Sequence, residues 1–239
     1  MPQIMEKLDG TAEQQLAEDR RLFERVENGV VDSGWRLWES DTTAVVLGRF
    51  GDAANDVFEA HCQHDGVPMV RRFSGGGAVV VGRGCLNFTV VFALPVYPEL
   101  ADVAHSFRIV LHRIGDALAV DGLSLAGGTD LVVGTRKVSG NAQRRGRRAL
   151  LHHGTVLYDF DPMLAARYLR EPRRQPGYRE RRAHTDFMGC LPVTREVLTA
   201  RLSKALAALV PVVEACRAIP SPWQAVLQSP ESHESLIVP

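Results

Sequence analysis

The sequence has little cysteine and no long apolar run. Its four cysteines, Cys62, Cys85, Cys190 and Cys216, are scattered and form no Cys-x-x-Cys pair. Neither a disulfide framework nor a zinc ribbon is therefore indicated. No apolar stretch approaches the roughly 18 to 20 residues that span a bilayer, and the N-terminus lacks the basic-then-apolar pattern of a signal peptide. These absences predict a cytoplasmic protein with no membrane partner.

An excess of charge of one sign is also missing. The chain has 239 residues, with 28 basic and 28 acidic side chains, and 45% of its residues are hydrophobic. This balance argues against a polyanion binder, so nucleic acid is not an expected partner. Lysine is scarce: Lys7, Lys137 and Lys204 are the only three in the sequence.

Hydrophobic periodicity predicts an α+β fold. Apolar residues recur at helical spacing over 11–27, 53–65, 101–120, 161–170 and 194–216. Alternating, β-branched stretches predict strands over 35–40, 42–50, 67–72, 78–81 and 86–94, with three more between 130 and 160. We expect 35–40 and 42–50 to pair, and the sheet to be central, mixed and mostly antiparallel, flanked by helices. Residues 1–216 are expected to form one domain, and the Pro- and Ser-containing residues 217–239 a loose tail.

The first candidate for chemistry is a glycine-rich segment between two expected strands. Three consecutive glycines let backbone N–H groups converge on an anion, and the adjacent arginine supplies a positive charge. A tight hairpin is the structural alternative. The segment is neither a Walker loop nor a Gly-x-Gly-x-x-Gly motif, because no helix with the required residues follows. Its residues are Arg72, Phe73, Ser74, Gly75, Gly76, Gly77, Ala78, Val79 and Val80.

The second candidate surrounds one of the rare lysines. Lys137 is flanked by Gly134, Gly140 and a small polar strand, so its ammonium could act where negative charge develops. An exposed hairpin lysine is the alternative. The segment after Asp130 contains Gly134, Thr135, Arg136, Lys137, Val138, Ser139, Gly140, Asn141 and Ala142.

The third candidate is the run His152, His153, Gly154 and Thr155. Adjacent histidines on a strand point to opposite faces, so they cannot easily bind one metal and at most one faces a site. No metal site is predicted.

In this order, the three segments resemble the lipoate-protein ligase A family of the biotin/lipoate ligase superfamily, over roughly residues 10–210. RRFSGGGAV is similar to the family's RRxSGGGAV lipoate-binding loop, and DLVVGTRKVSGNAQ to its segment that ends in R-K-V-S-G-x-A. HHGTVLYD follows at the expected distance, and WRLWESDTTAVVLGRF resembles the early strands. The resemblance implies a central mixed sheet with flanking helices, and an acyl chain that lies in a tunnel beside the glycine loop.

The resemblance also implies an enzyme that uses ATP and Mg²⁺ to activate lipoate or octanoate as an acyl adenylate. The acyl group would then pass to a lysine of a lipoyl carrier domain. Lys137 would be the catalytic residue, in contact with the acyl carbonyl and the α-phosphate, while Arg72 and the backbone of Gly77–Val80 would hold the nucleotide. The other binding residues would be Ser74, Gly75, Gly76, Asp130, Ser139, Gly140, Asn141, Ala142, His153, Gly154 and Thr155.

The sequence departs from the family in its length. Many family ligases have a C-terminal accessory domain, for which the residues after 216 leave no room, so a separate accessory subunit is a further expectation. Two alternatives stay open. Cys190 could be the nucleophile of an ATP-independent octanoyltransferase, or simply a small buried residue. The chain could also be a non-catalytic subunit that binds lipoate or a lipoyl domain.

Overall fold

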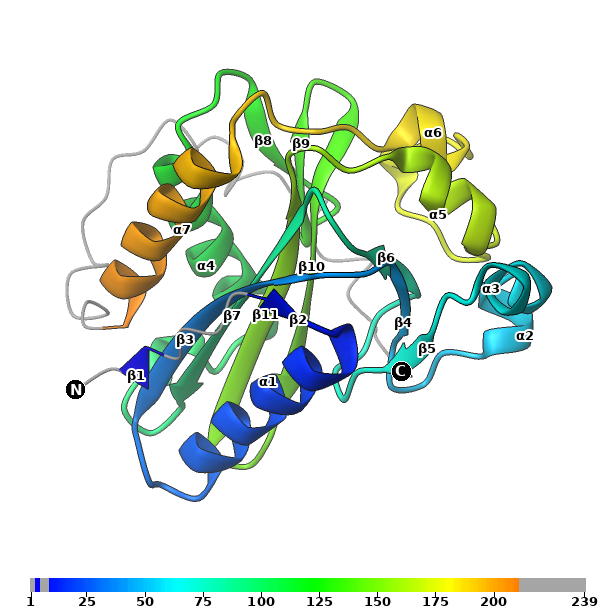
Figure 1. Ribbon diagram of the computed structural model, residues 1–239. Helices are drawn as coiled ribbons and strands as arrows, with labels where there is room; N and C mark the ends of the chain where they lie inside the picture. The colour runs from blue at the N-terminus through cyan, green and yellow to red at the C-terminus, as the bar shows by residue number, and fades with distance from the viewer. Residues whose placement is uncertain (1–2, 5–8, 211–239) are drawn as a thin grey trace.

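A twisted sheet of eight strands runs through the molecule (Figure 1). The computed structural model describes residues 3–4 and 9–210. Neighbouring strands follow the order β1-β3-β7-β11-β10-β9-β8, and β2 pairs with β3 beyond this path. The pairs from β3 to β8 are antiparallel, whereas β1 and β2 lie parallel to β3. The strands are β1 (Gln3–Ile4), β2 (Asp9–Gly10), β3 (Ser33–Ser40), β7 (Cys85–Ala93), β8 (Leu123–Ala126), β9 (Asp130–Val133), β10 (Arg136–Arg145) and β11 (Ala149–Leu157).

A second, three-stranded sheet lies beside the first and carries the glycine-rich segment. Its order is β5-β4-β6, from β4 (Ala44–Leu47), β5 (Met69–Arg71) and β6 (Val79–Val81). Because β4 separates β5 from β6, the glycines form a crossover loop and not a tight hairpin. The short helices α2 (Ala53–Asp56), α3 (Glu59–Asp65), α5 (Pro162–Tyr168) and α6 (His184–Phe187) lie on this side of the molecule (Figure 1).

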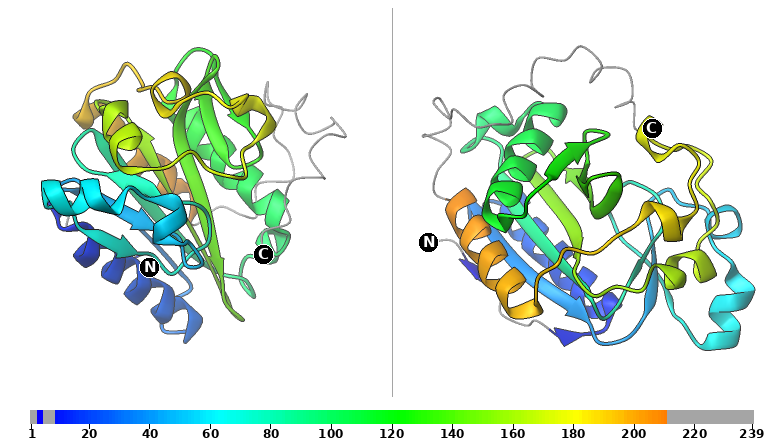
Figure 2. Two further views of the ribbon diagram at one scale, coloured as in Figure 1. Left: turned by 90° about the vertical axis from the view of Figure 1, so that its right-hand side faces the viewer. Right: turned by 90° about the horizontal axis from the view of Figure 1, so that it is seen from above.

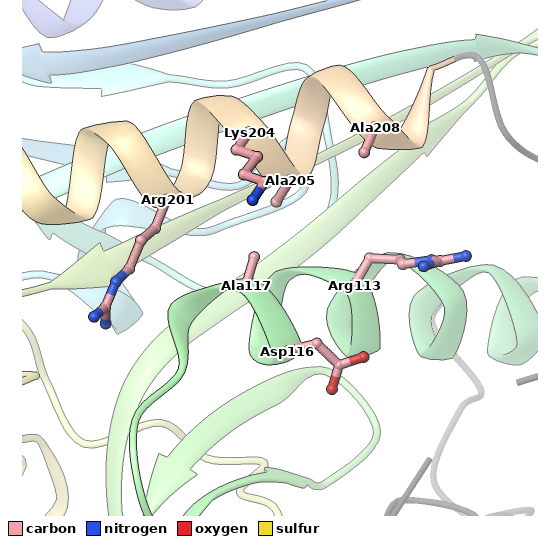
Figure 3. A pocket seen from close by; sticks show the side chains of 7 residues that line it. All are labelled: Arg113, Asp116, Ala117, Arg201, Lys204, Ala205 and Ala208. Atoms are coloured by element: carbon pink, nitrogen blue, oxygen red, sulfur yellow. The ribbon is translucent and has the colours of Figure 1, made fainter. Parts of the chain in front are cut away.

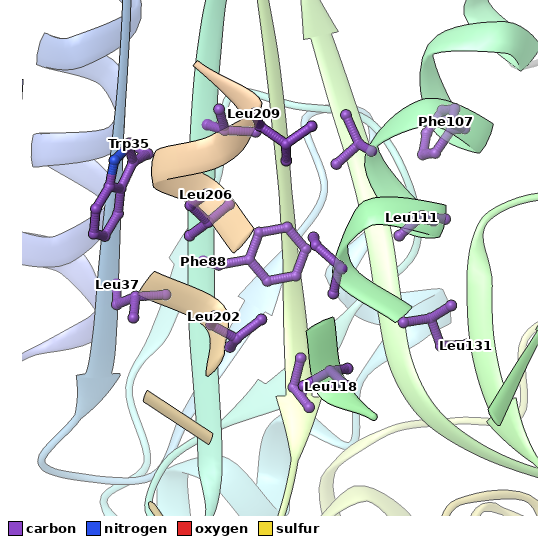
Figure 4. Close-up of a cluster of buried hydrophobic side chains, with 14 of the residues drawn as sticks. Trp35, Leu37, Phe88, Phe107, Leu111, Leu118, Leu131, Leu202, Leu206 and Leu209 are labelled. Carbon is purple, nitrogen blue, oxygen red and sulfur yellow. The ribbon is translucent and has the colours of Figure 1, made fainter. Parts of the chain in front are cut away.

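Long helices cover both faces of the large sheet (Figures 1 and 2). Helix α1 (Ala12–Glu27) packs on one face, while α4 (Val103–Leu118) and α7 (Arg195–Leu209) pack together on the other. Strand β7 shows why: Phe88, Val90 and Phe92 pack toward α4 and α7, and the alternate residues Val91 and Ala93 pack against α1. Figure 4 shows the larger of these clusters.

The helix starts follow from local capping chemistry. Thr11 Oγ1 accepts a hydrogen bond from the N–H of Gln14, whose side chain accepts in return from the Thr11 N–H, which completes a capping box for α1. Thr194 caps α7 in a similar way through the N–H of Val197.

The structure confirms the α+β class and the mostly antiparallel sheet. The expected pairing of 35–40 with 42–50 is wrong, because β3 enters the large sheet and β4 the small one. The helix expected over 53–65 is broken at Val57 and Phe58, and β8 was not predicted. Residues 211–216 of the last expected helix and the expected tail lie outside the described residues, so the domain division stays a prediction. Within residues 3–4 and 9–210, no helix combines the length and apolarity that a membrane span requires.

Candidate functional site

A β-bulge places Lys137 on the face of β10 that looks toward the glycine loop. Lys137 pairs with Val132 and Ser139 with Leu131, so Val138 is an extra residue in β10. A bulge of this kind reverses the side-chain alternation before it. Lys137 therefore shares a face with Gly140, while Val138 joins the core beneath α4 and α7. A regular strand would have turned Lys137 to the opposite face.

Asp130 and Tyr178 hold the Lys137 ammonium in place. Lys137 Nζ lies 3.0 Å from Asp130 Oδ1, and Tyr178 Oη donates to Asp130 Oδ2 at 2.6 Å. Burial, followed by the Asp130 charge and its hydrogen bond, raises the pKa of Tyr178 well above its ordinary value. Tyr178 therefore stays protonated as a donor. The Lys137 side chain is 29% exposed, so it is neither fully buried nor the free hairpin lysine of the alternative interpretation.

Gly140 leaves room for this arrangement. A Cβ at position 140 would lie 2.9 Å from both Cε and Nζ of Lys137. In the sheet register, Gly140 pairs with Asp130 on one side and Thr155 on the other, and Ala142 pairs with His153. Because directly opposite residues share a face, these side chains all lie on the Lys137 face of the sheet.

Arg72 shapes the glycine loop from inside. Its buried guanidinium donates to the carbonyl oxygens of Gly75 and Gly77, each at 2.8 Å, and to Ser74 Oγ at 3.1 Å. Burial lowers the pKa of Arg72 to about 10, which leaves it charged at neutral pH. With these carbonyls turned toward Arg72, the exposed backbone at Gly76 and Gly77 forms the outer surface of the loop. A Cβ on Gly77 would meet no atom within 4 Å.

The glycine loop also packs against the backbone of Gly48, a residue that none of the three candidate segments includes. A Cβ at Gly48 would lie 1.9 Å from the carbonyl oxygen of Gly76. The N–H of Arg49 donates to the carbonyl of Ser74 at 2.8 Å. Only glycine at position 48 permits this close backbone approach.

The two adjacent histidines face opposite sides, as predicted. His152 stacks on Phe88 and meets Phe107 edge-on, within the core beneath α4. Burial, then the neighbouring His153 and Arg145, lowers the pKa of His152 to about 3. His153 points the other way, with Nε2 at 2.6 Å from Ser74 Oγ. His153 is thus the one that meets the glycine loop.

Ser139, Asn141 and Gly154 lie on the His152 face, away from Gly140 and Ala142. Asn141 Nδ2 donates to the Thr129 carbonyl at 2.9 Å and to Ser139 Oγ at 3.1 Å. Its Oδ1 would lie 1.9 Å from a Cβ at Gly154. The predicted residues are therefore not all brought to one surface: Ser139 and Asn141 bond to each other and to the backbone behind Lys137.

Cys190 lacks the environment of an activated thiol. The residue is exposed, so the interpretation as a small buried residue is wrong. Although the residue as a whole is exposed, its Sγ–H donates to the carbonyl of Phe160 at 3.3 Å, and partial burial of the sulfur, together with nearby Asp159, raises the pKa of the thiol. A nucleophilic cysteine needs a lowered pKa.

Two of the surface hollows lie beside the long helices. One lies between α4 and α7, is drawn in Figure 3, and contains none of the predicted site residues. The other lies between α1 and β5 and is lined in part by Leu16, Arg20, Arg72 and Phe73. Within the described ranges, no group of three His, Cys, Asp or Glu residues is arranged to bind a metal ion.

The chain is similar to lipoate-protein ligases in sequence and in fold. A putative lipoate-protein ligase A of Aeropyrum pernix is 35% identical over 147 residues, which are 61% of this chain and 53% of the relative. The chain thus spans about half the length of this curated relative. The bipartite lipoate protein ligase of Thermoplasma acidophilum, from a structural study with its E2 lipoyl domain, has the same fold. Its TM-score is 0.70 at 18% identity, over 86% of this chain and 82% of that one.

A crystal structure of lipoate-protein ligase A bound with ATP also shares the fold, with a TM-score of 0.64 at 22% identity over 86% of this chain and 84% of that one. The family model of the lipoyl protein ligase A/B catalytic domain matches residues 11–197, a range that includes the glycine loop, Lys137 and His153. The chain belongs to the lipoyl protein ligase A/B catalytic domain family.

Proposed function

We propose that this protein activates lipoate, or a similar medium-chain acid such as octanoate, with ATP and transfers the acyl group to a lysine of a carrier domain. The Lys137 ammonium carries this proposal. It is partly exposed, is held by Asp130, and lies over the side-chain-free surface of Gly140. Two anions could meet there with little steric hindrance.

In the first step, a carboxylate oxygen of lipoate attacks the α-phosphorus of ATP. The new P–O bond forms as the bond to the β-phosphate bridging oxygen breaks, and pyrophosphate leaves with the electron pair. Lys137 is placed to offset the repulsion between the carboxylate and the α-phosphate and to stabilise the charge of the transition state. The ligase A structure bound with ATP has the same fold and supports a nucleotide as co-substrate.

The glycine loop is proposed as the binding surface for the acyl and nucleotide groups. Arg72 fixes the loop carbonyls inward, so the exposed backbone at Gly76 and Gly77 can lie flush against a ligand. Asp130, the acidic residue beside Lys137, is already paired with Lys137 and Tyr178. Mg²⁺, when bound, would therefore be held mainly by the nucleotide phosphates, to which it supplies charge neutralisation.

In the second step, the neutral amine of a carrier lysine attacks the acyl carbonyl. An amide bond forms, the acyl–phosphate bond breaks, AMP leaves, and the amine proton passes to solvent. A lipoyl carrier domain is the proposed acceptor, since the Thermoplasma ligase was studied with its E2 lipoyl domain. That ligase is bipartite, which supports an accessory subunit for this chain as well. A cytoplasmic location stays a prediction.

The thiol-transferase alternative is less well supported, because the Cys190 pKa is raised and not lowered. The test is to incubate the protein with lipoate, ATP and Mg²⁺ and to detect pyrophosphate and a bound acyl adenylate by mass spectrometry. The proposal predicts both. Their absence, with acyl transfer from an octanoylated carrier instead, would favour the transferase. Lipoate binding with neither reaction, even with an added accessory subunit, would favour a binding subunit.

A further inference from the structure

Beneath the glycine loop lies a buried chain of polar side chains, and two of its members, Gln15 and Asp19, belong to none of the motifs. Asp19 and Gln15 come from α1, Arg36 from β3 and His153 from β11. Asp19, Ser74 and Arg36 are at most 1% exposed, and His153 is 7% exposed. Ionisable groups buried this deeply require partners, so the arrangement of this chain needs an explanation.

The contacts link α1 to the glycine loop in one continuous path. Arg36 Nη1 donates to Asp19 Oδ1 at 2.5 Å and to the Gln15 carbonyl at 2.9 Å. The other oxygen of Asp19, Oδ2, faces His153 Nδ1 at 3.5 Å. On the far side of the ring, His153 Nε2 lies 2.6 Å from Ser74 Oγ, which accepts from Arg72 Nε at 3.1 Å.

The proton positions follow from the carboxylate of Asp19. A carboxylate can only accept, so a proton on His153 Nδ1 is favoured over a lone pair that would face Asp19 Oδ2 at 3.5 Å. In the neutral ring Nε2 is then an acceptor, so Ser74 Oγ accepts from Arg72 Nε and donates its own proton to His153 Nε2. Asp19 can take this role because Arg36 balances its charge. Asp19 therefore sets the tautomer of His153, and this tautomer decides whether Ser74 donates to the ring or accepts from it.

This order of residues resembles a serine hydrolase triad, but Ser74 is 0% exposed and cannot reach a substrate carbonyl. A positioning role fits the burial. We propose that Asp19, supported by Arg36, is a positioning residue that fixes the Nδ1–H tautomer of His153 and thereby the Ser74–Arg72 contact that shapes the glycine loop. The predicted effect on catalysis rests on the proposed function, whereas the predicted tautomer of His153 does not depend on it.

The direct test is nitrogen NMR of the wild-type protein with ¹⁵N-labelled histidine, which distinguishes the two neutral tautomers. The His153 signals are assigned by their loss in His153→Gln. The proposal predicts the Nδ1–H form. The Nε2–H form in the folded wild-type protein would overturn it, whatever the activity of the enzyme.

Asp19→Asn tests the consequence. An asparagine whose amide donates to Nδ1 would move the ring proton to Nε2, so Ser74 Oγ would accept from the ring and its own proton would lose His153 as its acceptor. We expect the Nε2–H tautomer and a KM for lipoate raised about tenfold, as for the loss of one hydrogen bond, with a smaller change in kcat. Glu24→Gln, on an exposed part of α1, is the matched control for loss of one acid and should leave both unchanged.

Asp19→Asn could unfold the chain by leaving Arg36 unpaired. Ser74→Ala breaks the same path at the other end without touching a charge, and should raise KM by a similar factor. A wild-type KM in folded Ser74→Ala would contradict the proposal. If the wild-type protein forms no adenylate at all, the proposed function fails, while the NMR result still decides the tautomer.

Discussion

Replacing Gly140 by alanine should displace the Lys137 ammonium and leave the fold intact. The new Cβ would lie 2.9 Å from Cε and Nζ of Lys137, whereas carbon atoms pack at about 3.5 to 4.0 Å. Gly140 lies outside the left-handed backbone region, so alanine adds no backbone strain. Because the obstructed group is the end of a flexible side chain, Lys137 should yield, by roughly 1 Å.

The expected effect on rate is much larger than the effect on stability. A misplacement of 1 Å at a reacting group can cost about 100-fold, which is about 2.7 kcal/mol of activation free energy. The Lys137–Asp130 ion pair is partly exposed on the lysine side. Its loss should lower the free energy of unfolding by less than about 1 kcal/mol.

The assay is lipoate-dependent pyrophosphate release, with urea denaturation measured in parallel. Gly177→Ala is the control, because a Cβ at position 177 meets no atom within 4 Å and the backbone there is outside the left-handed region. Any loss of stability in Gly140→Ala should vanish in a Lys137→Ala background, where the obstructed side chain is absent. A folded Gly140→Ala protein with the wild-type rate would refute this account of Lys137.

Three further predictions concern residues around the site. Cys190→Ala should keep wild-type adenylate formation and transfer, since its thiol has a raised pKa; loss of transfer alone would revive the thiol mechanism. Arg72→Lys should lower the free energy of unfolding by about 3 kcal/mol in urea melts, because an ammonium cannot reproduce the forked contacts to Gly75 and Gly77. His152 has a folded pKa of about 3 against about 6.5 when unfolded, so the unfolded state binds the extra proton and stability falls as the pH drops below 6.5. Between pH 7 and pH 5 this group should cost about 2 kcal/mol, and His152→Gln should lose correspondingly less stability over that range than the wild-type protein.

Much of the fold was accessible from local sequence patterns. The helix at 11–27 carries its own cap in Thr11, and the β-rich composition of 86–94 predicted a strand, which the structure buries on both faces. The pairing of strands was less accessible. Residues 35–40 and 42–50 are separated by a short polar turn, which suggests a hairpin. The sequence near β4 carries no signal that this strand pairs with β5 and β6 in a separate sheet.

In the candidate site, too, some features could be predicted from local sequence and others could not. The motifs singled out Lys137, Arg72 and His153 as candidates, and strand alternation correctly placed the two histidines on opposite faces. The bulge at Val138 was not predictable, because one extra residue in a strand leaves no mark in composition. Tyr178 and Asp19 were missed since each meets its partner through long-range packing: Tyr178 is 48 residues from Asp130 in sequence. A buried polar residue on the apolar side of the expected first helix was the one available signal for Asp19.

The central claim is that Lys137 promotes formation of an acyl adenylate. The most direct measurement is lipoate-dependent exchange of labelled pyrophosphate into ATP, compared between wild type and Lys137→Ala at equal folded concentration. The account predicts exchange in the wild-type protein and at least a 100-fold slower exchange in the variant. Equal exchange in the two proteins, with the variant shown to be folded, would contradict the assignment of Lys137.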